Sequence, residues 1–316
     1  MERLFKTVLL AVLFIGLAMV VHAAEKKLVV AIVPVALNNP IFVDALDSAS
    51  VAGSELGVEI LKNAPSNPDA AEQVKVVEGL IERKVDGILL FPVDSKALKG
   101  VVDRAVDRGI VVGILNSDIP DSRRAFYYGT DNYTLGKQCG EKMVEIMGGK
   151  GSVAVQTGVI GMDALDQRVN GFRDAIKGTG ITEVAFQAND DSSEKSIELI
   201  NTYLSANSNL DGYFITGGWP FFAPPESLPE LAKFRRRGGK FGIVDTFYPM
   251  FQYLDRPEPL VDFMIGQDYV AMGRNGVRMI VDILRGGKVK DVISYSPLEY
   301  CDQNNMKEIL AAKSAW

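Results

Sequence analysis

The sequence predicts an α/β protein of two similar lobes, each a doubly wound parallel sheet with helices on both faces. Short uninterrupted apolar runs alternate with longer amphipathic stretches, which is typical of strands covered on both faces and linked by helices. The alternation restarts after residues 129–132, so the chain holds two such units in tandem. Its 316 residues suit about two domains of roughly 150 residues each.

The first unit begins with a buried strand at 28–33, followed by a helix that Pro40 opens and Asn39 caps. Later stretches place apolar residues at helical spacing, as at Val74, Val77 and Leu80. The expected strands are 28–33, 58–61, 87–91 and 110–115, and the expected helices are 41–56, 69–84 and 95–108.

The second unit repeats this rhythm. Its expected strands are 152–156, 183–186, 211–215, 241–244 and 261–265, and its expected helices are 133–147, 163–177, 193–205, 229–237 and 270–285. Strands that alternate with helices of this length predict parallel sheets with right-handed crossovers. In such sheets a ligand crevice lies at the carboxyl ends of the strands.

The N-terminus has the pattern of a signal peptide. Arg3 and Lys6 precede an uncharged apolar run at 8–21, and small residues follow at Ala23 and Ala24. The run is shorter than the roughly 20 residues that span a membrane, which favours a cleaved signal over an N-terminal anchor helix. We therefore expect residues 1–24 to be a signal peptide, cleaved after Ala23 or Ala24, and the protein to be periplasmic.

Composition excludes several classes of protein. The net charge of -6 gives no electrostatic reason to expect nucleic acid as a partner. The one histidine, His22, lies within the predicted signal peptide. A mature chain without histidine cannot use a Ser–His–Asp or Cys–His mechanism or a histidine-based zinc site. We expect no cofactor, no metal and no catalysis.

Six motifs in a fixed order give the chain a specific resemblance. They are VxxxLNNPxFV at 33–43, GILLFPVDS at 87–95, GTDNYxLG at 129–136, QRVNGF at 167–172, GIVD at 242–245 and IGQ at 265–267. Over residues 29 to about 298 the chain resembles the periplasmic sugar-binding proteins of ABC transporters, in the ribose-binding family of type I periplasmic binding proteins. Taken singly, their polar residues are also explained as helix caps or solvated surface.

The resemblance implies two lobes joined by three hinge crossings, near 130–131, 267–268 and 296–297. The amino-terminal lobe would comprise residues 25–130 with 268–296, and the carboxyl-terminal lobe 131–267 with 297–316. The family's ligand contacts would fall on Asn39, Phe42, Asn116, Arg168, Asp245 and Gln267. Amides, a guanidinium and a carboxylate suit a ring of hydroxyl groups, and a phenyl ring suits its apolar face.

The chain also departs from the family pattern. Asn116 and Ser117 stand where the family has Asp-Arg, Asp191 stands where it has a second stacking aromatic, and Phe91 stands where a small amide is common. We expect Trp219, together with Tyr248, to rebuild the aromatic wall; the alternative for 219–222 is an apolar plug under a loop.

Two cysteines, Cys139 and Cys301, both fall in the expected carboxyl-terminal lobe. In an oxidising compartment such a pair favours a disulfide, with two thiols as the alternative.

The predicted function is that of the solute-binding component of an ABC importer. The protein, a monomer, would bind a sugar or sugar-like polyol between its lobes and deliver it to the membrane permease. One alternative is a periplasmic sensor that presents the bound sugar to a chemoreceptor or histidine kinase. A second alternative is a secreted carbohydrate-active enzyme that uses the acid pair Asp190 and Asp191.

Overall fold

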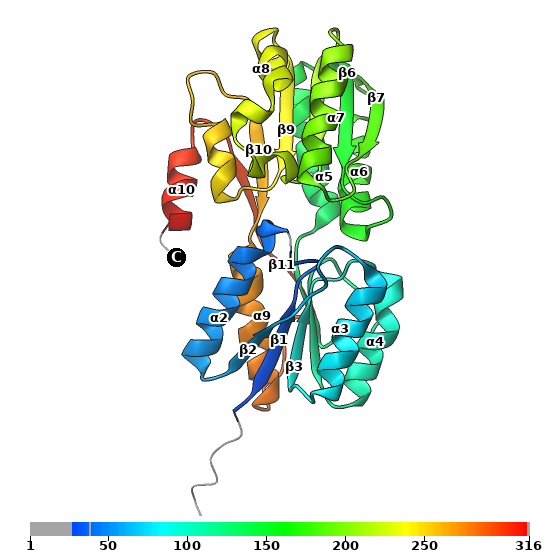
Figure 1. Ribbon diagram of the computed structural model, residues 1–316, viewed down its shortest axis with the longest axis vertical. Helices are drawn as coiled ribbons and strands as arrows, with labels where there is room; N and C mark the ends of the chain where they lie inside the picture. Colours follow the sequence, from blue (N-terminus) through cyan, green and yellow to red (C-terminus); the bar gives the residue numbers. More distant parts are fainter. Residues whose placement is uncertain (1–26, 38, 315–316) are drawn as a thin grey trace, which may run out of the picture.

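The structure, a computed structural model, describes residues 27–37 and 39–314. The predicted signal peptide lies outside these residues. Two six-stranded sheets form two lobes, stacked along the long axis of the molecule (Figure 1). The strand orders are β11-β5-β4-β3-β1-β2 and β12-β10-β9-β8-β6-β7. The two orders are equivalent, which confirms the predicted pair of similar doubly wound lobes.

The first lobe is a sheet between two helical layers. Helices α2 and α9 cover one face of the sheet, and α3 and α4 cover the other (Figure 1). Its elements are β1 (Val29–Val33), the 3-10 turn η1 (Pro40–Phe42), α2 (Val43–Leu56), β2 (Glu59–Lys62), α3 (Ala70–Glu82), β3 (Gly87–Leu90), α4 (Ser95–Asp107), β4 (Val111–Asn116), β5 (Phe126–Gly129), α9 (Tyr269–Leu284) and β11 (Ile293–Tyr295).

The second lobe repeats the three layers. Helices α5 and α6 cover one face of its sheet, and α7 and α8 cover the other. Its elements are α5 (Asn132–Met147), β6 (Lys150–Thr157), α6 (Asp163–Ile176), β7 (Gly180–Ala188), α7 (Ser193–Ala206), β8 (Gly212–Ile215), η2 (Trp219–Phe222), η3 (Pro225–Ser227), α8 (Pro229–Arg236), β9 (Lys240–Val244), η4 (Tyr248–Tyr253), β10 (Phe263–Gln267), β12 (Leu298–Cys301) and α10 (Met306–Ser314).

Strands β5, β11 and β12 and helix α10 have no counterpart among the predicted elements. The strands are three or four residues long, and their segments, FYYG, ISY and LEYC, lack the runs of β-branched or aliphatic residues that marked the predicted strands. Strand β12 also pairs antiparallel with β10, whereas the other ladders are parallel. The chain passes from one sheet to the other three times: between β5 and α5, between β10 and α9, and between β11 and β12.

Helices α5 and α6 pack through glycine. A Cβ atom added to Gly136 would lie 2.0 Å from the carbonyl oxygen of Arg168, and one added to Gly171 would lie 2.1 Å from the carbonyl oxygen of Tyr133. Neither helix could approach so closely with a side chain at these positions. The contact therefore fixes the backbone that carries Arg168.

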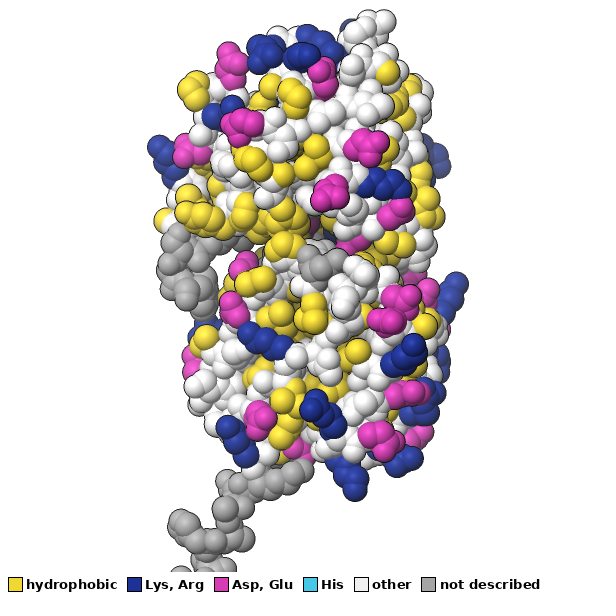
Figure 2. Space-filling model, viewed as in Figure 1, with side chains coloured by type: hydrophobic (Ala, Val, Ile, Leu, Met, Phe, Trp, Pro, Cys, Tyr) yellow, Lys and Arg dark blue, Asp and Glu magenta, His cyan; other side chains and the backbone are white. Residues whose placement is uncertain are grey.

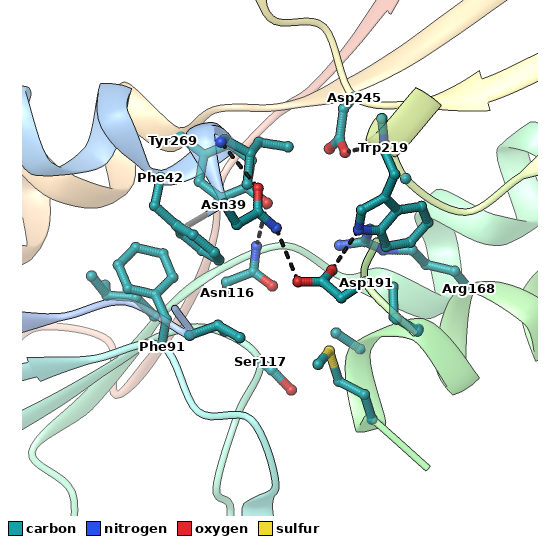
Figure 3. Close-up of a pocket in the computed structure, with 18 of the residues that line it drawn as sticks. Asn39, Phe42, Phe91, Asn116, Ser117, Arg168, Asp191, Trp219, Asp245 and Tyr269 are labelled. Carbon is teal, nitrogen blue, oxygen red and sulfur yellow. Dashed lines mark hydrogen bonds between the residues drawn. The ribbon is translucent and has the colours of Figure 1, made fainter. Parts of the chain in front are cut away.

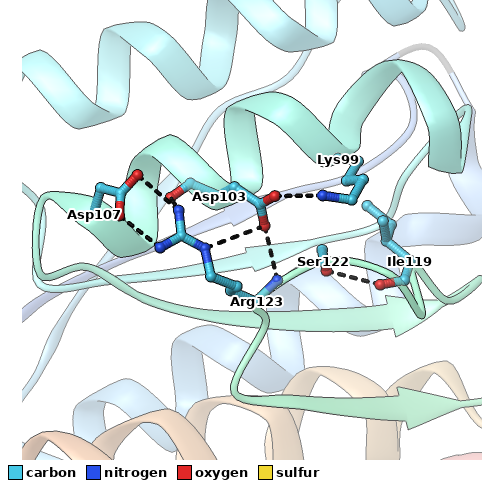
Figure 4. Close-up of polar contacts among 6 residues, drawn as sticks. All are labelled: Lys99, Asp103, Asp107, Ile119, Ser122 and Arg123. Carbon is cyan, nitrogen blue, oxygen red and sulfur yellow. Dashed lines mark hydrogen bonds and ion pairs between the residues drawn. The ribbon is translucent and has the colours of Figure 1, made fainter.

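Arg123 holds the loop between β4 and β5 against helix α4 through hydrogen bonds and ion pairs (Figure 4). Its guanidinium donates to both carboxylate oxygens of Asp107, at 2.6 and 2.7 Å, and its backbone N–H donates to Asp103 at 2.8 Å. Asp103 also accepts a 2.6 Å bond from Lys99. These donors lower the pKa of both carboxyls. The loop that they hold begins at Ser117, at the boundary between the lobes.

The predicted disulfide between Cys139 and Cys301 is wrong, because neither cysteine is disulfide-bonded. Cys139 lies in α5, in the apolar layer on the Phe263 and Ile265 face of the second sheet. Cys301 pairs across strands with Met264 and packs in the layer on the opposite face. The sheet therefore separates the two thiols.

Charged side chains of both signs are interspersed over both lobes on the face that Figure 2 shows. Among the residues that the structure describes, no helix combines the length and apolar character needed to cross a membrane.

Candidate functional site

A cavity lies between the lobes, at the carboxyl ends of the strands (Figure 3). It offers about 60 Å³ to the centres of water-sized molecules, roughly four to six times the ~10–15 Å³ that one water needs. Gln267 lies behind this cavity, and the other eight predicted site residues line it: Asn39, Phe42, Phe91, Asn116, Arg168, Asp191, Trp219 and Asp245. The structure thus gathers residues that are up to 206 positions apart in the sequence.

The first lobe supplies an aromatic wall. Phe42 follows β1 and meets Phe91, which follows β3, edge to face at 5.2 Å between ring centroids. Tyr269, at the start of α9, meets Phe42 edge to face at 5.7 Å. Asn39 caps the η1 turn, since its Oδ1 accepts from the backbone N–H of Ile41 at 3.2 Å. Its NH₂ group is then left to face the second lobe.

Arg168 is buried in the second-lobe side of the site. Its Nε donates to Oδ1 of Asn132, its Nη1 donates to the carbonyl of Thr216, and its Nη2 donates to Oε1 of Gln267, each at 2.8 Å. These three bonds hold the guanidinium plane in one orientation. Because a guanidinium has five N–H groups, two remain for other acceptors.

Gln267, at the end of β10, links the polar residues of both lobes. Its Oε1 accepts from Asn116 at 2.9 Å, from Arg168 at 2.8 Å and from Thr130 at 3.0 Å. Its Nε2 donates to Oδ1 of Asp245 at 2.8 Å and to the hydroxyl of Tyr269 at 3.1 Å. The side chain therefore acts behind the cavity, by orienting groups that face it.

Three residues of the lining adopt a left-handed backbone. Asn116 has φ 67°, Asp191 has φ 61° and Asp245 has φ 87°. This region disfavours residues with a Cβ, although asparagine and aspartate enter it more readily than most. Each of the three stands at or just after the end of a strand, where the turn directs its side chain to the boundary between the lobes. Such outliers are typical of binding sites.

Asp191 closes the second-lobe side of the cavity (Figure 3). Its carboxylate accepts from the indole N–H of Trp219 and, at 3.4 Å, from the NH₂ group of Asn39 in the other lobe. Burial raises the pKa of this carboxyl above its usual range. A second contact between the lobes joins the backbone N–H of Ser95 to Asp163 at 3.3 Å.

The lining of the cavity includes two residues that the sequence did not predict and lacks one that it did. Tyr269 and Phe222 also line the cavity. Burial raises the pKa of the Tyr269 hydroxyl, which stays protonated and accepts from Asn116 and Gln267. Tyr248 is wrongly predicted, because its side chain is 71% exposed and lies outside the lining. The available signal for Tyr269 was its place two residues after Gln267, at the carboxyl end of a strand.

The plug predicted as the alternative for 219–222 is formed by Phe221. Its buried ring packs against Tyr253 at 4.3 Å and Phe241 at 5.9 Å between centroids. Trp219 instead borders the cavity. Within the described part of the chain, no cluster of three or more metal-binding side chains is present.

Comparison with known proteins identifies the architecture around this cavity. A family model described as the periplasmic binding protein domain matches residues 30–288. The chain belongs to the periplasmic binding protein family. This confirms the resemblance carried by the six sequence motifs. Proteins of this family bind solutes and are not enzymes, which confirms the expectation that the chain catalyses no reaction.

Several relatives of this periplasmic binding protein are named for the sugars that they bind. A D-ribose/D-allose-binding protein of Pseudomonas aeruginosa is 29% identical over 206 residues, which cover 62% of this chain and 65% of that protein. The ribose import binding protein RbsB of Bacillus subtilis is 24% identical over 263 residues, 83% of each chain. The chain thus spans about two thirds of the first curated relative that it matches.

Solved structures share the whole fold. The solute-binding protein of an ABC transporter from Burkholderia graminis, in complex with D-arabinose, superposes with a TM-score of 0.83 and 28% identity over 89% of this chain and 97% of that chain. GanP, a glucose-galactose binding protein from Geobacillus stearothermophilus, gives a TM-score of 0.80 with 25% identity over 89% of this chain and 99% of that chain.

Proposed function

We propose that this protein binds a sugar or sugar-like polyol in the periplasm and delivers it to the permease of an ABC importer. The observation that carries the proposal is a small cavity that both lobes line with directed hydrogen-bonding groups and aromatic rings. The D-ribose, D-allose and D-arabinose in the names of its relatives support a monosaccharide-sized ligand. The N-terminal signal peptide would direct export and would be cleaved after Ala23 or Ala24.

Each polar residue of the cavity offers a different bond to a hydroxyl group. The two unused N–H groups of Arg168 would donate, the Asp245 carboxylate would accept, and the Asn39 and Asn116 amides can do either. The Phe42, Phe91 and Trp219 rings would cover the apolar faces of the ligand. Bonds to the charged groups contribute about 1.5–3 kcal/mol each, so two or three supply much of the roughly −8.2 kcal/mol of a micromolar complex.

Ligand binding would favour closure of the lobes. The Asn39–Asp191 and Ser95–Asp163 contacts are the described polar links across the mouth and are individually long, at 3.4 and 3.3 Å. A ligand that contacts both lobes has bonds in the closed state that the open state lacks, and this difference in affinity shifts the population. The moving bodies would be residues 25–130 with 268–296 and residues 131–267 with 297–316, hinged at the three crossings.

A thermal-shift screen of the mature protein against pentoses, hexoses and polyols tests the proposal. A ligand present at 100 times its dissociation constant adds about 2.7 kcal/mol to the free energy of unfolding. Asp245→Ala should weaken the binding of any ligand found by about tenfold to a hundredfold. Glu198→Ala, an exposed acid of α7 outside the cavity, should leave it unchanged. Equal affinity in the two variants would place the site elsewhere.

Delivery to the permease needs its own test. Uptake of the labelled ligand should be lost in cells without this protein and restored by its expression. Undiminished uptake in the deletion strain would contradict an import role and favour the sensor alternative.

A further inference from the structure

Carboxylates outnumber cations around the site. The cavity described above is lined by Asp191 and Asp245 but by one cation, Arg168. A larger outer cavity, of about 580 Å³ measured in the same way, adjoins it and shares Asn39, Asp191, Trp219 and Phe222 with it. The outer lining adds Asp190 and Glu194 and, among the described residues, contains no lysine or arginine. The described lining of the two cavities therefore carries more carboxylates than cations, although Asp190 pairs with Lys195.

Arg168 forms no ion pair with Asp191 among the described contacts. Arg168 is committed to three acceptors, Asn132, Thr216 and Gln267. The described partners of Asp191 are the neutral indole of Trp219 and the neutral amide of Asn39. No ion pair to Asp191 is formed within the described residues, whereas neighbouring Asp190 pairs with Lys195. The raised pKa of Asp191 agrees with a carboxylate that is buried without a cation.

Aromatic side chains line the same two cavities. Trp219 and Phe222 border both cavities, and Phe42 and Phe91 form the opposite wall of the inner one. The face of an aromatic ring attracts a cation, by about 0.5–1 kcal/mol at exposed sites and about 2 kcal/mol or more where water is excluded. A neutral polyol gains nothing from this attraction, and an anionic ligand such as a sugar phosphate is repelled by the acidic mouth.

We infer that the ligand is a cationic polyol, an amino sugar or amino-deoxy polyol whose ammonium group pairs with Asp191 between the aromatic rings. The inference rests on the proposed function and narrows its substrate class. The hydroxyl groups of the ligand would occupy Arg168, Asp245 and Asn116, and the ammonium group would take the position next to Asp191 and Trp219. Both the acidic entrance and the carboxylate without a cation then have a role in recognition.

Matched ligand pairs test this inference by isothermal titration calorimetry on the mature protein. The probes are D-glucosamine against D-glucose, D-galactosamine against D-galactose, and 1-amino-1-deoxy-D-sorbitol against D-sorbitol, which each differ by one ammonium in place of a hydroxyl. At least one amine should bind at least tenfold more tightly than its neutral partner. Asp191→Asn should remove that preference, and Glu198→Gln should keep it because it removes the same charge away from both cavities.

The ratio of amine to neutral affinity is the informative readout. Asp191→Asn also alters the contact with Asn39, but any effect on lobe closure acts on both members of a pair and cancels in the ratio. If every neutral sugar binds at least as tightly as its amine, the cationic ligand is refuted and the proposed sugar-binding function stands. If no member of the panel binds, the cationic ligand is refuted, and the thermal-shift screen against pentoses, hexoses and polyols decides the proposed function. A preference that survives Asp191→Asn also refutes the assigned role of Asp191.

Discussion

Replacement of Gln267 by leucine should destabilise the protein more than any other single change in the site. The side chain is 3% exposed and makes five hydrogen bonds, two of them to the charged groups of Arg168 and Asp245. Leucine offers neither an acceptor nor a donor, so five buried partners each lose a bond. The loss falls on residues of both lobes, because Asn116 and Thr130 come from the first sheet and its exit.

The magnitude follows from these bonds. A neutral hydrogen bond contributes about 1 kcal/mol and one to a charged group about 1.5–3 kcal/mol, which sets a ceiling of about 6–9 kcal/mol for the five. Water and rearranged partners recover part of this, so we expect a loss of about 3–5 kcal/mol in the free energy of unfolding.

Urea denaturation of the ligand-free protein measures this loss as a lower midpoint at an unchanged slope. The matched control is Gln303→Leu, at an exposed position, which should change the free energy of unfolding by less than about 0.5 kcal/mol. A loss below about 1 kcal/mol for Gln267→Leu would refute the reasoning, because water would then satisfy the partners as well as the amide does.

Three further predictions concern stability and thiol chemistry. Asp191→Asn should increase the free energy of unfolding of the ligand-free protein at pH 7. Burial raises the pKa of Asp191 in the folded state, so the ionised carboxylate destabilises the fold above that pKa. The difference in stability between variant and parent should vanish as the pH falls towards about 3.9, the pKa of an aspartate in the unfolded chain. Gly136→Ala should lower the free energy of unfolding by about 3 kcal/mol or more, because the added Cβ atom collides with the backbone of α6. Gly79 has open space around it, so Gly79→Ala should raise the free energy of unfolding by about 0.5–1 kcal/mol through the better helix propensity of alanine in α3. Cys139 and Cys301, both buried, should resist a thiol reagent in the native protein and both react after denaturation without reductant.

Each of these has a contrary outcome. Denaturation curves across pH would contradict the first if the variant and the parent protein had equal stability at pH 7. Equal midpoints for the two glycine variants would contradict the second. A denatured protein that reacts only after reduction would contradict the third and restore the disulfide.

The sequence predicted the layers of the fold because buried parallel strands carry long apolar runs and their covering helices carry a clear period. It did not predict β11 and β12, because these short segments, ISY and LEYC, mix polar with apolar residues and form no uninterrupted apolar run. The prediction of a disulfide between Cys139 and Cys301 was wrong for a related reason. A linear sequence does not reveal that Cys301 faces the opposite side of the sheet from Cys139.

Residues of the site could be predicted where they follow a strand, as Asn39, Asn116 and Asp245 do, because the carboxyl ends of parallel strands converge. Gln267 illustrates what could not be predicted. The resemblance implies a ligand contact at this residue, whereas its side chain bonds to five other groups behind the cavity and is absent from the lining. Tyr248 shows the limit of choosing aromatics by proximity in sequence. The 3-10 segment that carries it turns this side chain outward and buries Met250 and Phe251 instead.

The left-handed backbone at Asn116, Asp191 and Asp245 restricts how this site can be redesigned. In a directed-evolution library that randomises these positions fully, most variants would carry a residue that disfavours the left-handed backbone at the end of the strand. Valine, isoleucine and threonine would be the worst. Asparagine, aspartate and glycine keep the turn. Changes of ligand preference should therefore be sought first among these three residue types, with wider diversity kept for Phe91, Ser117 and Phe222, where φ is ordinary.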